Sequence, residues 1–184
     1  YEQNGAAAIS VLTDQKFFGG QLEFIQQVKA VTELPILRKD FIISEYQIWE
    51  SFQAGADAIL LIADAVDECL LTDLYNLAAE LGMHIIIETH SAENLHWIQA
   101  LNPPIVGVNC RNLKTMTTNI EWFEEAYSQL PKDSIKVAES GINSPDNLAK
   151  ISQMGYDAAL VGTSLMKTGT PGSALATLLR RTPV

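Results

Sequence analysis

Lys39 is the residue whose surroundings first suggest chemistry. It lies in "PILRKDF" (35–41), where Arg38, Lys39 and Asp40 end an otherwise apolar run. Charges are costly to bury without partners, so these side chains either form ion pairs or serve a reaction. A lysine in an apolar slot beside carboxylates suits acid catalysis, because burial and neighbouring charges tune its pKa. On the residues alone, an ion pair of Lys39 with Asp40, or of Arg38 with a nearby acid, remains an alternative.

Polar residues also end other apolar runs. Glu88 follows three isoleucines, and a buried carboxylate usually has a partner or a role. Neighbouring strand residues face opposite ways, so Lys39 shares a face with Phe41. One polar group at the same end of each strand predicts a common pocket. The candidates are Lys39, Glu88, Asn109 with Arg111, Glu139 with Ser140, and Thr163 with Ser164.

Strands and helices must alternate to position these residues. The apolar runs are 6–12, 35–41, 58–64, 84–90, 105–110, 135–140 and 158–166. The amphipathic segments between and after them are 22–31, 45–56, 67–82, 91–101, 120–130, 144–155 and 172–181. Helix starts are expected at Ser44, Asp67, Ser91 and Ser144, and helix ends at Gly55, Gly82 and Gly155. We expect Trp49, Trp97 and Trp122 in the core under helices.

This alternation predicts an α/β fold with a parallel sheet. A doubly wound sheet is the alternative, but the sequence lacks its GxGxxG turn. Polar residues at many strand ends favour a (β/α)8 TIM barrel, as a single domain over residues 1–184. Only seven of the eight βα units are recognisable. Phosphate sites of such barrels follow the last two strands, and the candidates for such a site here are "ESGI" (139–142) and "VGTSLM" (161–166). Because these two segments end the last two strands of the chain, we expect the missing first strand and helix to belong before Tyr1.

Composition limits the class of protein. The chain has 184 residues, 47% of them hydrophobic, and a net charge of −10, which disfavours nucleic-acid binding. No apolar run reaches the roughly 20 residues that span a membrane, and no signal peptide is recognisable. The two cysteines, Cys69 and Cys110, lie far apart, which favours a reducing compartment and provides no zinc motif. We therefore expect a cytoplasmic protein.

The chain resembles the indole-3-glycerol phosphate synthase family of tryptophan biosynthesis. The matching motifs include "PILRKDFIISEYQI", "IIIETH", "VGVNCRNL", "VAESGI" and "LVGTSLM". The resemblance implies a carboxy-lyase that closes the ring of 1-(2-carboxyphenylamino)-1-deoxyribulose 5-phosphate. Carbon dioxide and water leave, and indole-3-glycerol phosphate forms. The resemblance also implies that the substrate is a sugar phosphate and that no metal or organic cofactor is needed.

The resemblance assigns roles to individual residues. Lys39 matches the acid or carboxylate-binding lysine, and Glu88 the acid–base residue of the dehydration. Asn109 and Arg111 match residues that contact substrate hydroxyls and carboxylate, and Glu139 lies beside the substrate. The implied catalytic set is Lys39, Glu88, Asn109 and Glu139. The implied substrate-binding set is an apolar slot of Phe18, Phe41, Leu60 and Leu113, with Arg111, and a phosphate grip of Ser140, Gly141, Gly162 and Thr163.

The departures from the family pattern define the alternatives. "ETH" and "NCRN" replace the commoner "EVH" and "NNRD", and Thr163 replaces a frequent serine. The family's first strand, with a second catalytic lysine, is not in this chain. One alternative is a fragment that binds phosphate without turnover. Another depends on assembly, as a homo-oligomer or with a complementing N-terminal segment, because an open strand edge favours pairing.

Overall fold

Two compact units make up the computed structural model, which describes residues 1–112 and 115–180. The amino-terminal unit is Ala7–Glu88. The carboxy-terminal unit combines Tyr1–Ala6 with Thr89–Val184. Each unit alternates parallel strands with helices, as the sequence predicts. That residues 1–184 form a single domain stays a prediction.

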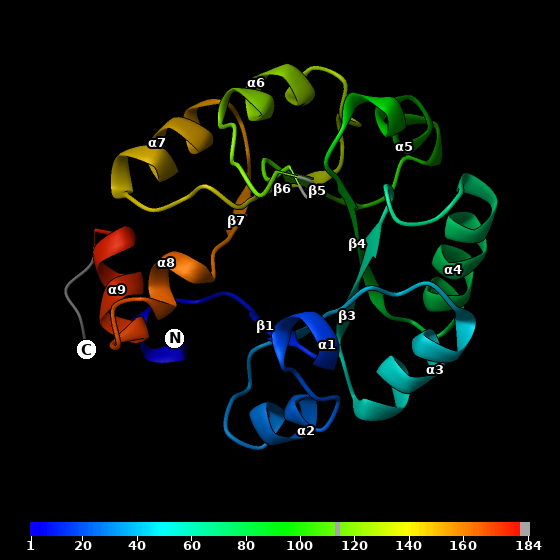
Figure 1. Ribbon diagram of the computed structural model, residues 1–184, viewed down its shortest axis with the longest axis horizontal. Coiled ribbons are helices and arrows are strands. Elements are labelled where there is room, and N and C mark those ends of the chain that lie inside the picture. The colour runs from blue at the N-terminus through cyan, green and yellow to red at the C-terminus, as the bar shows by residue number, and fades with distance from the viewer. Residues whose placement is uncertain (113–114, 181–184) are drawn as a thin grey trace. The chain divides into compact units, whose positions relative to one another are not determined.

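The amino-terminal unit holds four parallel strands in chain order. They are β1 (Ile9–Leu12), β2 (Ile36–Lys39), β3 (Ala58–Ile62) and β4 (His84–Thr89), the last of which ends at the boundary of the unit. The helices are α1 (Gln15–Phe18), α2 (Phe24–Lys29), α3 (Glu45–Ala54) and α4 (Glu68–Glu80). Figure 1 shows α3 and α4 along one side of the strands β3 and β4.

Burial and capping explain these elements. Strand β3 is apolar throughout and nearly inaccessible, as expected for a strand covered on both faces. The Asp67 side chain accepts a hydrogen bond from the Leu70 N–H and so begins α4. Gly55, in the left-handed conformation at φ 82°, ends α3. The predicted starts and ends of these two helices are confirmed.

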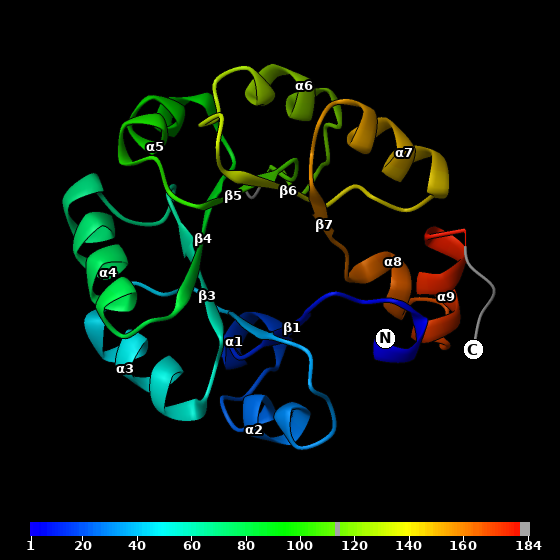
Figure 2. The ribbon, with the colours of Figure 1, turned by 180° about the vertical axis from the view of Figure 1, so that it is seen from behind.

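Among its described residues, the carboxy-terminal unit holds three parallel strands. They are β5 (Ile105–Asn109), β6 (Ile135–Glu139) and β7 (Ala158–Leu160). Its helices are α5 (Leu95–Leu101), α6 (Glu121–Tyr127), α7 (Pro145–Gln153), α8 (Thr163–Met166) and α9 (Pro171–Leu178), with 3-10 turns η1 (Glu2–Asn4) and η2 (Ala92–Asn94). Figure 2 shows α6 and α7 along one side of these strands, and η1 beside α9.

Local signals account for this unit too. Ser144 caps α7 by accepting from the Asn147 N–H, and Pro145 occupies the first turn. Strand β7 is shorter than the predicted run 158–166, because α8 already begins at Thr163. Within the described residues, no helix has the length and apolar character needed to cross a membrane.

Candidate active site

Lys39 and Glu88 form an ion pair in the amino-terminal unit. The distance between Lys39 Nζ and Glu88 Oε2 is 3.2 Å, and the Glu88 side chain is only 2% exposed against 23% for Lys39. Lys39 is the last residue of β2 and Glu88 the last but one of β4, and both strands pair with β3. The predicted convergence of strand-end side chains is therefore observed for this pair. A buried carboxylate beside an accessible ammonium can hold and move a proton.

Phenylalanine rings lie at the same end of β2. The Phe18 ring stacks on the Phe41 ring at a centroid distance of 6.0 Å, and Phe17 meets Phe41 edge-on at 5.6 Å. Phe17 and Phe18 are 66% and 51% exposed. Exposed aromatic rings in contact offer a flat apolar surface to an aromatic ligand. Phe17 was not among the predicted site residues, although the "FF" pair in the sequence was a signal for it.

A tight loop places these phenylalanines. Asp14 caps α1 by accepting from the Phe17 N–H at 2.5 Å, and Gly19 ends the helix at φ 64°. At Gly20 the chain passes so close to β1 that a Cβ would lie 2.2 Å from the Leu12 carbonyl oxygen. Only glycine fits there. Leu60, predicted for the apolar slot, is fully buried on β3.

Asn109 and Glu139 lie opposite each other on β5 and β6 of the carboxy-terminal unit. They are 7% and 1% exposed. Asn109 Oδ1 accepts a hydrogen bond from the Arg111 N–H at 3.0 Å, which shapes the turn after β5. The Arg111 carbonyl in turn lies 2.8 Å from His90 Nδ1, so His90 supports the backbone of this turn.

The two loops predicted to grip phosphate are tied together by Ser164. Its hydroxyl donates to the Ile142 carbonyl at 2.8 Å, so the loop after β6 contacts the start of α8. Ser140 and Gly141 have φ values of 69° and 68°, and such a conformation is uncommon for serine. Gly162 and Thr163 are exposed beside this contact.

Cys110 explains why position 141 is glycine. A Cβ on Gly141 would lie 2.8 Å from the Cys110 sulfur. Burial raises the pKa of the Cys110 thiol, so a neutral sulfur packs against the loop. Both cysteines are free thiols.

The predicted residues thus fall into two groups. Phe18, Lys39, Phe41 and Glu88 come together in the amino-terminal unit. The carboxy-terminal unit brings Asn109 to Glu139, and the Ser140 loop to the start of α8. Leu113 lies outside the described residues. The roles of all these residues stay predictions.

The comparisons identify the family. The sequence model of the family "Indole-3-glycerol phosphate synthase" matches residues 1–178. An indole-3-glycerol phosphate synthase of Magnetococcus marinus is 43% identical over 181 residues, which are 98% of this chain and 68% of that protein. One from a Nocardioides species is 46% identical over 175 residues, 95% of this chain and 67% of that protein.

Solved structures of other enzymes share the fold. Orotidine 5'-phosphate decarboxylase from Pyrococcus horikoshii matches with a TM-score of 0.72 and 16% identity, over 94% of this chain and 85% of that chain. For 3-hexulose-6-phosphate synthase from Salmonella typhimurium, the TM-score is 0.76 at 13% identity, over 93% of this chain and 84% of that chain. The predicted TIM-barrel class is thereby confirmed, with seven strands among the described residues. By its match along nearly its whole length, the chain belongs to the indole-3-glycerol phosphate synthase family.

Proposed function

We propose that this chain carries the ring-closing chemistry of its family. The substrate is 1-(2-carboxyphenylamino)-1-deoxyribulose 5-phosphate, and the products are indole-3-glycerol phosphate, carbon dioxide and water. The observation that carries the proposal is the 3.2 Å pair of Lys39 with the buried Glu88. The stacked rings of Phe18 and Phe41 support it, because the substrate contains an aromatic ring that needs an apolar face.

Lys39 supplies the first proton. The ring carbon that bears the carboxylate forms a bond to the ketose carbonyl carbon, and the carbonyl oxygen takes a proton from the Lys39 ammonium. The carboxylate then leaves as carbon dioxide, and its bonding electrons restore the aromatic ring. A cation placed where negative charge develops on oxygen lowers the barrier to this step.

Glu88 acts as the acid–base group of the dehydration step. The new hydroxyl takes a proton, its bond to carbon breaks with help from the nitrogen lone pair, and water leaves. The Glu88 carboxylate takes a proton from the neighbouring CH2 carbon, whose C–H electrons form the C=C bond of the indole ring. Asn109 and Glu139 complete the catalytic set, and Arg111 binds the substrate carboxylate or hydroxyls. In this proposal Ser140, Gly141, Gly162 and Thr163 bind the phosphate, and the substrate-binding role of Leu113 and of the fully buried Leu60 stays a prediction.

Phosphate binding without turnover is the second candidate. The Ser164–Ile142 hydrogen bond supports it, because it joins the two loops independently of Lys39. The relatives are longer than this chain, which spans 68% of the Magnetococcus marinus protein. We also propose a complementing segment or a second copy of the chain as a partner. A cytoplasmic location is proposed with the function and agrees with two free thiols.

A fluorescence assay for indole-3-glycerol phosphate tests the proposal. One sample contains this chain, and a second also contains the part of the Magnetococcus marinus protein that the chain does not match. We expect product in at least one sample, and none after Glu88→Gln. Silence in both samples, with inorganic phosphate still bound by calorimetry, would replace the enzyme proposal with the binding alternative.

A further inference from the structure

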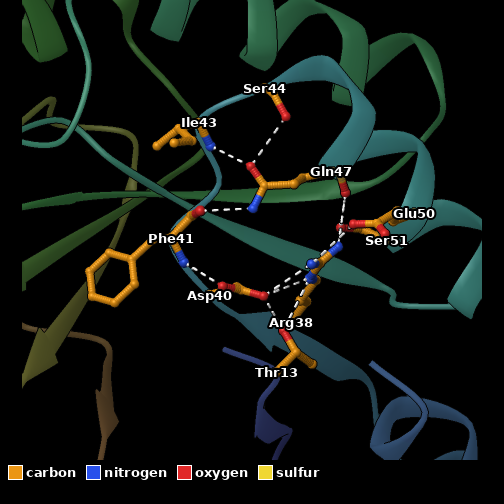
Figure 3. A network of polar contacts seen from close by, with 9 residues as sticks. All are labelled: Thr13, Arg38, Asp40, Phe41, Ile43, Ser44, Gln47, Glu50 and Ser51. Atoms are coloured by element: carbon orange, nitrogen blue, oxygen red, sulfur yellow. Dashed lines mark hydrogen bonds and ion pairs between the residues drawn. The ribbon is translucent and has the colours of Figure 1, made fainter. Parts of the chain in front are cut away.

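Arg38 and Asp40 flank Lys39 in the sequence, but their side chains lie on the other side of β2. Neighbouring side chains of a strand face opposite ways, so Lys39 reaches Glu88 while Arg38 reaches Ser51 of α3. Arg38 and Asp40 are 4% and 8% exposed, and Arg38 Nη2 lies 3.0 Å from Asp40 Oδ2 (Figure 3). Two opposite charges, next to Lys39 in the sequence, are therefore buried together on the other face of the strand.

Asp40 ties the end of β2 to the residue that follows β1. Its Oδ2 accepts a hydrogen bond from the Thr13 hydroxyl at 2.5 Å, and its Oδ1 accepts from the Phe41 N–H at 2.8 Å. The backbone N–H of Thr13 donates to the Lys39 carbonyl at 3.3 Å. The carbonyl of Lys39 and the amide of Phe41 are thus both held through Asp40 and its partner Thr13.

Gln47 of α3 holds the segment after Lys39 from the other side. Its Nε2 donates to the Phe41 carbonyl at 2.9 Å, and its Oε1 accepts from the Ile43 N–H at 2.9 Å. The Gln47 carbonyl accepts from Arg38 Nη1 at 3.0 Å. Figure 3 shows these contacts as one continuous set from Thr13 to Gln47.

Stability alone does not explain a buried ion pair at this place. Well-packed apolar side chains of similar size usually stabilise a fold as well or better. Charge-assisted hydrogen bonds instead impose direction, and they hold the backbone in one geometry. Lys39 needs such a backbone, because its long side chain must bring Nζ to Glu88 across the intervening strand β3.

We propose that Thr13, Arg38, Asp40 and Gln47 form a positioning network that holds Lys39 and Phe41 in their working geometry. The proposal rests on the proposed function, because it assigns the network to the lysine that donates the proton. The four residues act through Lys39 and Phe41 and are positioning residues. Their effect on Lys39 is measurable without turnover.

The test follows the Lys39 ammonium by NMR. Reductive methylation with ¹³C-formaldehyde labels lysines and keeps their charge, and loss of a signal in Lys39→Arg assigns Lys39. Glu88→Gln defines where that signal moves when an amide replaces the partner carboxylate. We expect Thr13→Val and Asp40→Asn to shift the Lys39 signal toward that position, and the conservative Thr13→Ser to leave it unchanged. The Lys29 signal is the internal control and should stay in place in all variants.

A purely structural network gives a different result. The proposal is overturned if Thr13→Val and Asp40→Asn lower the urea midpoint while the Lys39 signal stays at its original position. Should Asp40→Asn fail to fold, the Thr13 variants decide alone, because valine is isosteric with threonine and serine keeps the hydroxyl. In a mixture that forms product, Thr13→Val should lower kcat about tenfold with KM changed less than about threefold, as expected for a displaced catalytic group.

The turnover assay separates this proposal from the proposed function. A shifted Lys39 signal without product formation in any sample would support positioning and remove the proposed reaction. Product formation with an unmoved Lys39 signal would support the reaction and remove the network. The two proposals can therefore fail independently.

Discussion

The charged side chains at the two ends of strand β2 differ in their exposure to solvent. At its start, the Ile36 N–H donates to the Asp57 carboxylate at 2.9 Å, and Lys29 Nζ lies 3.0 Å from the same carboxylate. The side chains of Lys29 and Asp57 are 46% and 37% exposed. At the end of β2, the paired side chains of Arg38 and Asp40 are 5% and 8% exposed. The charged side chains at the start are partly solvated, and Asp57 accepts a hydrogen bond from the strand backbone. The charged side chains at the end, which flank Lys39 in the sequence, are buried.

Strand β6 of the carboxy-terminal unit shows the contrast for its carboxylates but not for Lys136, which lies near the start of the strand and is only 7% exposed. The Lys136 N–H donates to Asp157 Oδ2 at 2.8 Å, and the Asp157 N–H donates back to the Lys136 carbonyl at 2.9 Å. At the other end of β6, Glu139 is 1% exposed. In barrels of this class the carboxyl ends of strands carry catalysis and the amino ends carry stability. The carboxylates agree with that division, because Asp157 is exposed and Glu139 is buried, whereas the buried Lys136 does not follow it.

The largest effect should come from the Lys39–Glu88 pair. In a sample that forms product, Lys39→Met or Glu88→Gln should lower kcat by about 10²–10⁴, the usual contribution of a positioned proton donor or acceptor. Lys29→Met, at the other end of the strand, is the matched control and should change kcat little. Steady-state rates measure the effect, and near-normal rates in the Lys39 variant would contradict the functional assignment of this end.

The buried Arg38–Asp40 pair should dominate stability at the same end. Arg38→Met leaves the Asp40 carboxylate buried beside an apolar side chain and should lower the free energy of unfolding by about 3–5 kcal/mol. The double variant Arg38→Met/Asp40→Leu should recover much of this loss, because neither charge remains. Urea denaturation at pH 7 measures both. Equal losses in the single and double variants would show that packing, and not charge, governs the site.

Two glycines occupy equivalent places before strand starts and differ in what surrounds them. Gly55 and Gly155 precede β3 and β7 at φ 82° and 101°. A Cβ on Gly55 would meet Lys29 Cδ at 3.7 Å, whereas one on Gly155 would lie 2.2 Å from the Tyr127 hydroxyl oxygen. Gly55→Ala should cost about 1 kcal/mol for its conformation, and Gly155→Ala roughly 1–3 kcal/mol more for the displaced ring. Thermal unfolding of both variants tests the order, and a reversal would contradict it.

The smallest effect should come from Asp57. Burial by itself would raise the pKa of Asp57. The Ile36 N–H, Lys29 and His84 together lower the pKa by more than burial raises it, so the pKa of Asp57 lies below its usual value. The stabilisation is thus complete above the ordinary aspartate pKa, near pH 4, and is lost as the pH falls through the lower folded value. Asp57→Asn should cost about 1 kcal/mol or less at pH 7, and this cost should shrink as the pH falls below about 4. Urea midpoints across this range measure the change, and a constant difference would exclude the titration of Asp57 as its cause.

Much of the fold was predictable from local patterns. Apolar runs and capping residues predicted the strands and most helices, because both signals act within one turn or strand. The short helix α1 was missed, since it rests on the Asp14 cap and the close passage of Gly20 against β1. Trp49 was expected in the core and is 50% exposed, which shows that residue type alone does not decide which helix face is covered.

Local patterns along the chain predicted the order of strands and helices, and which residues share a face of each strand. Periodicity carries that information, because alternation and capping depend only on neighbours along the chain. The sequence pattern placed four candidate residues at or near strand ends, Lys39, Glu88, Asn109 and Glu139. The same pattern did not identify the partner of Lys39. The tertiary structure decided that Arg38 pairs with Asp40 and that Lys39 pairs with Glu88. An ion pair requires two charges within a few ångströms, and for residues on β2 and β4 only the arrangement of the strands brings this about.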